Sequence, residues 1–233
     1  MSPRPKTASD AVIVEAASRL LSRMGPARLR LEDVAREVGL APATLLLRFK
    51  SKKKLLLAVA EHGIAGMADY FREHRRQSPS PLHAIAAVSQ CVRDIADDPQ
   101  HLANLLAFLQ LSLEDQEFRA CAERHDAALE REMAQLMVEA QERGEVIPCC
   151  PEALARGVIA MVRGSLLTWN AVGKRTSPEA WVRANLETLL GPYTVATPGR
   201  GVAVRSKPPA PVSLPSARAP RRRAPARRVR AAS

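Results

Sequence analysis

The side chains best suited to chemistry in this sequence are hydrogen-bond donors grouped around position 48. Thr44 and Arg48 lie four residues apart, and a basic run follows them at Lys50, Lys52, Lys53 and Lys54. Hydroxyl and ammonium groups can donate to phosphate oxygens, and a guanidinium can also pair in bidentate fashion with guanine. These donors therefore indicate a nucleic-acid surface, on which Arg48 could contact either a base or a phosphate.

The surrounding residues, 31–56, predict the elements that would hold these donors in place. Gly39 breaks a first helix, and Pro42 suits the first turn of a second one. The first helix is indicated by apolar residues at helical spacing, namely Leu31, Val34, Ala35 and Val38. Two short helices joined by a tight turn form a helix-turn-helix, whose second helix enters the major groove of DNA.

The rest of the chain also reads as helix, so the expected fold class is all-α. An amphipathic helix is predicted over 9–24, ended by Gly25 and Pro26, and Ser51 is a plausible N-cap for a long helix that reaches about residue 76. Proline and glycine then separate five further candidate helices, at about 82–98, 100–112, 115–143, 151–173 and 177–191.

Charge divides the chain into three regions. The net charge of +11 resolves into +7 over residues 1–60, −6 over 61–196 and +10 over 197–233. The last region is rich in Pro, Ala and Arg and contains no acidic residue, so it cannot offset its ordering entropy by burial and is expected to be disordered. It is either an arm that adds nonspecific affinity for nucleic acid or a solvated tail.

The N-terminal part of the chain resembles the TetR family of bacterial transcriptional repressors. The family pattern I-L-x-A-A-x-x-L-F-x-x-x-G is matched by Ile13, Val14, Ala16, Ala17, Leu20, Leu21 and Gly25. The pattern D-I-A-x-x-A-G-V is matched by Asp33, Val34, Ala35, Val38, Gly39 and Leu40, and S-x-G-T-L-Y-x-H-F corresponds to residues 41–49. The following x-S-K-x-x-L-L is matched by Ser51, Lys52, Leu55 and Leu56.

This resemblance implies a repressor that a small-molecule effector releases from a pseudo-palindromic operator in double-stranded DNA. It implies a three-helix DNA-binding head over 7–67 and a helical ligand-binding and dimerisation domain over 68–196. Composition adds a short basic arm over 1–6 and the tail over 197–233. A homodimer would form through the last two helices. The helix predicted near 151–173 agrees, because it is apolar over more than half its circumference and needs a cover.

The resemblance also assigns residues to two sites. The expected DNA-binding residues are Arg28, Arg30, Pro42, Ala43, Thr44, Leu46, Leu47, Arg48, Lys50 and Lys52. The effector pocket is implied by the family alone, and its candidates are polar or large side chains on otherwise apolar helices: His101, Phe108, His125, Met137, Trp169 and Asn170. Each candidate could also be a packing or surface residue.

Three positions depart from the family pattern. Ala41 replaces the usual Ser or Thr cap, Leu46 replaces the usual tyrosine, and Leu47 stands at a commonly aromatic or polar position. Leucine can touch a thymine methyl group but cannot read a donor–acceptor pattern. An alternative is therefore a nucleoid-type protein that binds nucleic acid with little sequence preference through the head and the basic tail.

Other classes of protein find little support. The His and Cys residues lack metal-ligand spacing, and no nucleophile–base pair or glycine-rich phosphate loop is recognisable, so we expect neither an enzyme nor a cofactor. No apolar run reaches the length of about 18 residues needed to span a membrane. The expected location is the bacterial cytoplasm, in association with the nucleoid.

Overall fold

The fold is described from a computed structural model, which places residues 8–89, 99–171 and 176–195. Every regular element in these ranges is helical, apart from an isolated antiparallel bridge between Val146 and Thr194, and the predicted all-α class is confirmed. The helices are α1 (Asp10–Arg28), α2 (Leu31–Val38), α3 (Pro42–Phe49), α4 (Lys52–Gln77), α5 (Pro81–Ser89), α7 (Pro99–Glu114), α8 (Gln116–Glu142), α9 (Pro151–Ala171), α10 (Pro178–Leu190) and a 3-10 turn (Gly191–Tyr193).

The first four helices begin and end close to the predicted residues. Ser9 caps α1 and Ser51 caps α4, because their hydroxyl oxygens accept from the Val12 and Lys54 amides at 3.4 and 3.2 Å. Gly39 ends α2 in the left-handed conformation with φ 69°. The backbone leaves helical geometry at Gly25 as expected, but the helix resumes after this kink and continues to Arg28.

The head is built from α1 to α3 and the first turns of α4, around one apolar core. Ile13, Val34, Leu45 and Leu55 are almost fully buried there. Phe118 of α8 belongs to the same core, and Phe108 of α7 packs against it. The core of the head therefore continues into later helices rather than ending at a domain boundary.

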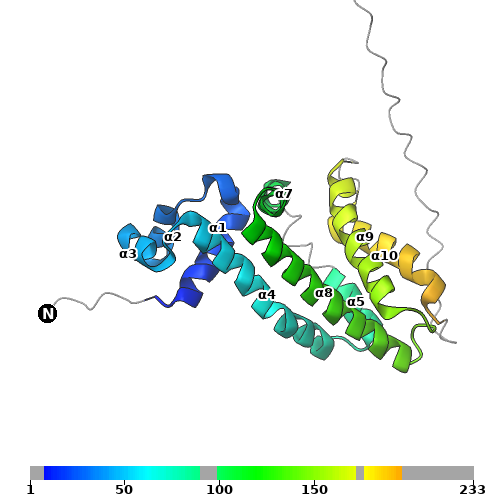
Figure 1. The fold of residues 1–233 in the computed structure, drawn as a ribbon. Coiled ribbons are helices and arrows are strands. Elements are labelled where there is room, and N and C mark those ends of the chain that lie inside the picture. The colour runs from blue at the N-terminus through cyan, green and yellow to red at the C-terminus, as the bar shows by residue number, and fades with distance from the viewer. Residues whose placement is uncertain (1–7, 90–98, 172–175, 196–233) are drawn as a thin grey trace, which may run out of the picture. The chain divides into compact units, whose positions relative to one another are not determined.

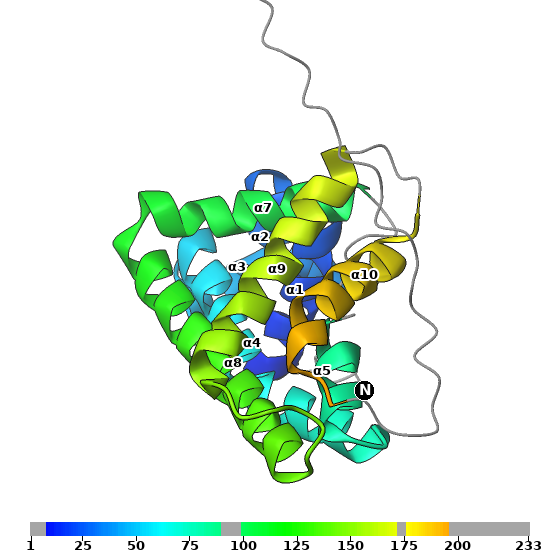
Figure 2. The ribbon, with the colours of Figure 1, turned by 90° about the vertical axis from the view of Figure 1, so that its right-hand side faces the viewer.

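A second core lies among α4, α5, α8, α9 and α10. Its fully buried side chains include Phe71, Ile85, Met137 and Val158, and Leu186 joins them from α10. The long helices α4 and α8 pack along each other and reach from the head to this core (Figure 1). Figure 2 shows α9 and α10 side by side, as their mutual contacts also indicate.

Several predicted regions fall outside the described residues. These are the basic arm over 1–6, the second half of the helix predicted over 82–98, the end of the helix predicted over 151–173, and the tail over 197–233. Among the helices that are described, none has the length and apolar character to cross a membrane.

Candidate nucleic-acid interface

Helix α3 presents an apolar face to solvent. Leu45 is fully buried, whereas the side chains of its neighbours Leu46 and Leu47 are 53% and 71% exposed. Pro42 and Ala43 in the first turn are also exposed, and Thr44 is half-buried. Both leucines on which the sequence departs from the family pattern thus lie on the outer surface of α3.

The start of α3 lacks a side-chain cap, as the sequence indicated. Ala41 is the N-cap residue and makes no side-chain hydrogen bond, and Pro42 occupies the first helical position. A proline there needs no amide partner and already has a helical φ angle. The loss of a polar cap costs about 1 kcal/mol, and Pro42 offsets part of it.

Arg48 faces the first helix instead of the exposed face of α3. Its Nη1 donates to the Ala8 carbonyl at 2.6 Å, and its Nη2 forms an ion pair with the Asp10 carboxylate. The guanidinium therefore ties the C-terminal end of α3 to the N-terminus of α1. Contact with a base requires Arg48 to exchange these partners for DNA.

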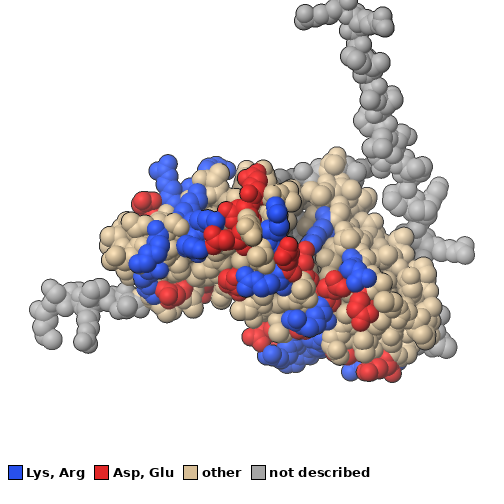
Figure 3. All heavy atoms as spheres, viewed as in Figure 1, with Lys and Arg blue, Asp and Glu red and all other residues tan. Residues whose placement is uncertain are grey.

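The remaining predicted cations lie at helix ends of the head, and we call them the basic rim: Arg28, Arg30, Lys50 and Lys52. Arg28 lies in the last turn of α1, Arg30 caps α2, and Lys50 follows α3 with a positive φ of 65°. Lys52 opens α4 and donates from Nζ to the Ala27 carbonyl at 3.1 Å. Figure 3 shows Lys and Arg side chains, with some Asp and Glu side chains among them, beside the uncharged surface at the α3 end of the molecule.

The next two lysines are neutralised by a later helix. Lys53 Nζ lies 2.7 Å from carboxylate oxygens of both Asp115 and Glu117, and Lys54 Nζ lies 2.5 Å from Glu117. We call these four residues the lysine–carboxylate cluster. The hydrogen bonds from Lys53 hold the pKa of both carboxyl groups below the usual range, and the same bonds, first that to Asp115, raise the pKa of Lys53.

A second polar link joins the head to α7. Asn104 is buried, and its Nδ2 donates to the Ser22 carbonyl of α1 at 2.7 Å, while its Oδ1 accepts from Gln100 at 2.9 Å. The amide group lies directly against Gly25, where an added Cβ would stand 2.6 Å from Asn104 Oδ1. The kink in α1 and the position of α7 therefore depend on each other.

Comparison with known families accounts for both halves of the described chain. Residues 13–59 match the model described as bacterial regulatory proteins, tetR family, and residues 84–191 match the C-terminal domain of BetI-type transcriptional repressors. The chain belongs to the TetR family. It is a DNA-binding transcriptional regulator, and its family and fold are those of regulators rather than of enzymes.

Solved structures of other regulators share this TetR fold. A putative TetR-family regulator from Rhodococcus sp. is 24% identical with a TM-score of 0.60, and the match covers 78% of this chain and 97% of that chain. The regulator FadR from Bacillus subtilis, solved with stearoyl-CoA, is 17% identical with a TM-score of 0.62 over 78% and 98% of the two chains.

A regulator from Saccharomonospora viridis, solved with choline, is 19% identical with a TM-score of 0.65. The match covers 80% of this chain and 98% of that chain. At these identities the likeness concerns the fold. No curated protein matches the sequence.

The six effector candidates of this TetR-family chain are distributed over different environments. Phe108 stacks edge-on against Phe118 beside the head core, with ring centroids 6.0 Å apart, whereas Met137 is fully buried in the second core. Trp169 is buried and donates from Nε1 to the Thr176 carbonyl at 2.8 Å, and His125 lies at the surface beside Asp126.

The two remaining candidates, His101 and Asn170, are not brought together with the other four in a shared cavity. The buried Nδ1 of His101 finds no hydrogen-bond partner among the described residues, and the side chain of Asn170 is not described. None of the six residues lines either of the two grooves described next. The effector assignment stays a prediction.

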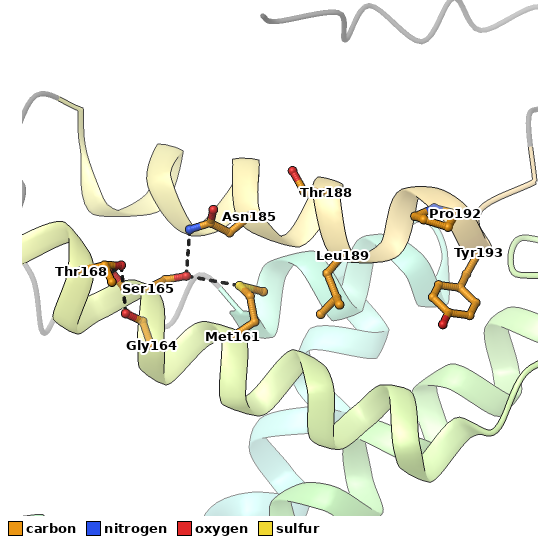
Figure 4. Close-up of a pocket in the computed structure, with 9 residues that line it drawn as sticks. All are labelled: Met161, Gly164, Ser165, Thr168, Asn185, Thr188, Leu189, Pro192 and Tyr193. Atoms are coloured by element: carbon orange, nitrogen blue, oxygen red, sulfur yellow. Dashed lines mark hydrogen bonds between the residues drawn. The ribbon is translucent and has the colours of Figure 1, made fainter. Parts of the chain in front are cut away.

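An open groove of about 640 Å³ runs along the surface where α9 and α10 meet in this TetR-family domain (Figure 4). Ser165 lies in its wall, accepting from Asn185 Nδ2 at 3.0 Å and donating to Met161 Sδ at 3.3 Å. Gly164, Thr168, Thr188, Leu189, Pro192 and Tyr193 complete the lining. This surface combines small and apolar residues with a few satisfied polar groups.

A smaller groove of about 260 Å³ lies between α8 and α9 and is crossed by two ion pairs. Arg156 contacts Glu130 at 2.6 Å, and Arg163 pairs with Asp126. The described residues contain no group of three or more His, Cys, Asp or Glu side chains suited to hold a metal ion.

Proposed function

We propose that this regulator is a homodimeric repressor that docks two copies of α3 into successive major grooves of a pseudo-palindromic operator. The observation that carries the proposal is the exposed face of α3 inside the basic rim. In helix-turn-helix dimers the two recognition helices fit grooves about 34 Å apart. The division into a head over 7–67 and a ligand-binding and dimerisation domain over 68–196 is part of the proposal, as is action on the bacterial nucleoid.

The proposed residue roles separate positioning on the backbone from reading of bases. Arg28, Arg30, Lys50 and Lys52 contact phosphates from the rim, and Thr44 donates to a phosphate from α3. Pro42, Ala43, Leu46 and Leu47 lie against the base edges. Arg48 either reaches a base after leaving Asp10 or grips a phosphate.

Dimerisation through α9 and α10 is supported by the surface of these helices. Their groove is open, and Leu167 of α9 leaves 51% of its side chain exposed. Small residues such as Gly164 and Ser165 permit close approach of a second helix pair. In the proposed dimer the same surface of the partner covers this one, since two-fold interfaces are self-complementary.

Release by a small molecule is supported by the ligands in similar structures, since the matched regulators were solved with stearoyl-CoA and with choline. An effector acts only if it binds the two head spacings with different affinity. In this chain the second domain can act on the head through the lysine–carboxylate cluster and through Asn104.

Operator binding by three single variants tests the proposed function. Lys52→Ala and Thr44→Ala are expected to weaken binding to all sequences, whereas Arg48→Ala should also relax sequence preference. Arg131→Ala, which removes an exposed cation from α8, is the matched control. If all three head variants bind DNA as the native chain does in a salt titration, the head is not the DNA-binding surface.

The nucleoid-type alternative is favoured by one specific observation, the apolar outer face of α3 with Arg48 turned toward α1. Removing residues 197–233 separates the two functions. A sequence-specific repressor keeps its preferred site without the tail, although its nonspecific affinity falls. A protein that binds mainly through head and tail charge loses its binding.

A further inference from the structure

We propose that Leu46 and Leu47 read the C5-methyl groups of thymines in the major groove. Operator preference would then be set by the position of methyl groups more than by a pattern of donors and acceptors. This inference rests on the proposed docking of α3 into DNA, and it specifies what the helix recognises there.

The geometry of α3 places the two leucines at the centre of its outer face. Residues three and four positions apart share one side of a helix, so Ala43, Leu46 and Leu47 form one surface. Leu46 and Leu47 are more than half exposed, whereas Leu45, on the opposite side of the helix, is fully buried in the head core. A helix that enters a groove with this face leading brings the two leucines to the base edges.

The polar side chains of α3 do not compete for this position. Arg48 is bound to the Ala8 carbonyl and to Asp10, on the side that faces α1. Thr44 is half-buried, and Lys50 lies beyond the end of the helix. The middle of the face therefore offers methyl groups alone, which can neither satisfy nor discriminate hydrogen-bonding groups on the bases.

The charge around the leucines identifies their partner as a polyanion. Arg28, Arg30 and Lys50 are exposed, and Lys52 opens α4 directly after the end of α3. A duplex satisfies both features, because its phosphates meet the rim and its groove carries an apolar group.

Thymine is the standard base that presents a methyl group in the major groove. The methyl distinguishes T·A from A·T, so two leucines in each half-site can specify an oriented pair of positions. Burying one methyl group contributes about fourfold in affinity. Two contacts in each half of a palindrome are sufficient for a measurable preference.

The test replaces thymine by deoxyuridine, which removes the methyl and keeps the pairing edge. Preferred duplexes are first selected from a random pool with the full-length protein, and each thymine of the best site is then replaced in turn. We expect about fourfold weaker binding at each contacted position, with the other thymines insensitive. Leu46→Ala and Leu47→Ala should each remove the sensitivity at one position, while circular dichroism shows an unchanged helical content.

Leu113→Ala is the matched control, since Leu113 is an exposed leucine of α7 outside the head. This variant should keep the full sensitivity to deoxyuridine. If native protein selects a site but ignores every thymine-to-deoxyuridine change, methyl reading is wrong and operator docking stands.

Three further outcomes also overturn methyl reading. Equal sensitivity in both leucine variants and in the native chain would mean that the methyl acts through DNA shape. If no duplex is bound, or Leu46→Ala and Leu47→Ala leave DNA binding intact but abolish binding of a protein partner, the proposed use of α3 fails as well.

Discussion

At the scale of single residues, Lys50 of the basic rim has an energetically unfavourable backbone conformation. It has φ 65° and ψ −34°, and among the described residues it alone has a positive φ without being glycine. Residues in such conformations cost on the order of 1 to 3 kcal/mol and persist where the surroundings or a function require them. A glycine would relieve the cost, so the proposed phosphate contact would explain why a lysine stands here.

Replacing Lys50 therefore separates stability from binding. Lys50→Gly should be more stable to urea than Lys50→Ala by about 1 kcal/mol, because glycine tolerates the positive φ and alanine does not. Both variants should bind DNA more weakly than the native chain, with a salt dependence reduced by about one phosphate contact. Equal stability of the two variants would show that the turn is not strained.

The residue roles that the sequence predicts correctly are those set by residues nearby in the chain. The exposure of Leu46 and Leu47 and the capping by Ser51 belong to this class. The contact of Arg48 with Asp10 does not, because the two residues are far apart in the sequence and helix periodicity says nothing about where α1 lies relative to α3.

At the scale of elements, α1 and α7 pack against each other and include a close approach between Gly25 and Asn104. Gly25 adopts φ 76° directly against the Asn104 amide, which also bonds to α1. The family pattern marks Gly25 as the end of the first helix. The structure adds a second reason for glycine, since a Cβ there would push the Asn104 amide out of its present position.

Gly25→Ala should accordingly lower the free energy of unfolding by about 2 to 4 kcal/mol, from the positive φ together with the clash. The double variant Gly25→Ala with Asn104→Ala should recover part of that loss, because the clash disappears and the backbone strain persists. Urea denaturation of the native chain, both single variants and the double variant gives the coupling. Additive effects would contradict the proposed contact.

The lysine–carboxylate cluster connects α4 to α8, and in the proposed complex it would compete with DNA phosphates for Lys53 and Lys54. The double variant Asp115→Asn with Glu117→Gln removes both negative charges but keeps the N-cap of α8. The side-chain oxygen of asparagine can still accept from the backbone N–H groups of residues 117 and 118, as Asp115 Oδ1 does. DNA binding should become tighter, with a salt slope steeper by up to about 1.8 for two added phosphate contacts. Glu130→Gln, which breaks the α8–α9 pair, is the control. Unchanged affinity would mean that these lysines do not reach the backbone.

The cluster also gives a pH dependence with a defined sign. Because the pKa values of Asp115 and Glu117 are lowered in the folded chain, their stabilising effect is present above the unfolded carboxyl range and disappears as pH falls through the lowered values. The raised pKa of Lys53 extends the effect on the alkaline side until pH rises through it. The melting temperatures of the native chain and the double variant should differ at pH 7 and converge under acid conditions.

At the scale of the whole molecule, the head core reaches Phe118 and Phe108, so the DNA-binding helices do not pack as an independent unit. The sequence predicted the order and type of helices because apolar spacing and proline or glycine breaks are local signals. It did not predict that the effector candidates would lie in separate environments, since cavities arise from packing between distant helices. For the lysine–carboxylate cluster, the sequence offered only the net negative charge of residues 61–196.

Introducing a charged residue on the exposed surface of α9 tests the proposed homodimer. Leu167→Arg should give a monomer by sedimentation and lose operator binding, because a charge at a buried two-fold contact meets its own copy. Leu113→Arg introduces the same charge at an exposed leucine of α7 and should stay dimeric. A dimeric Leu167→Arg variant would place the interface elsewhere.

The exposed leucine pair of α3 also has a thermal consequence. Apolar burial has a negative heat capacity of association and weakens on cooling, whereas the entropy of counterion release from phosphates persists. A head that discriminates through Leu46 and Leu47 would hold DNA in the cold mainly by its rim. Its choice among sites would then sharpen as the cell warms, so that temperature itself adjusts how selectively the protein occupies the genome.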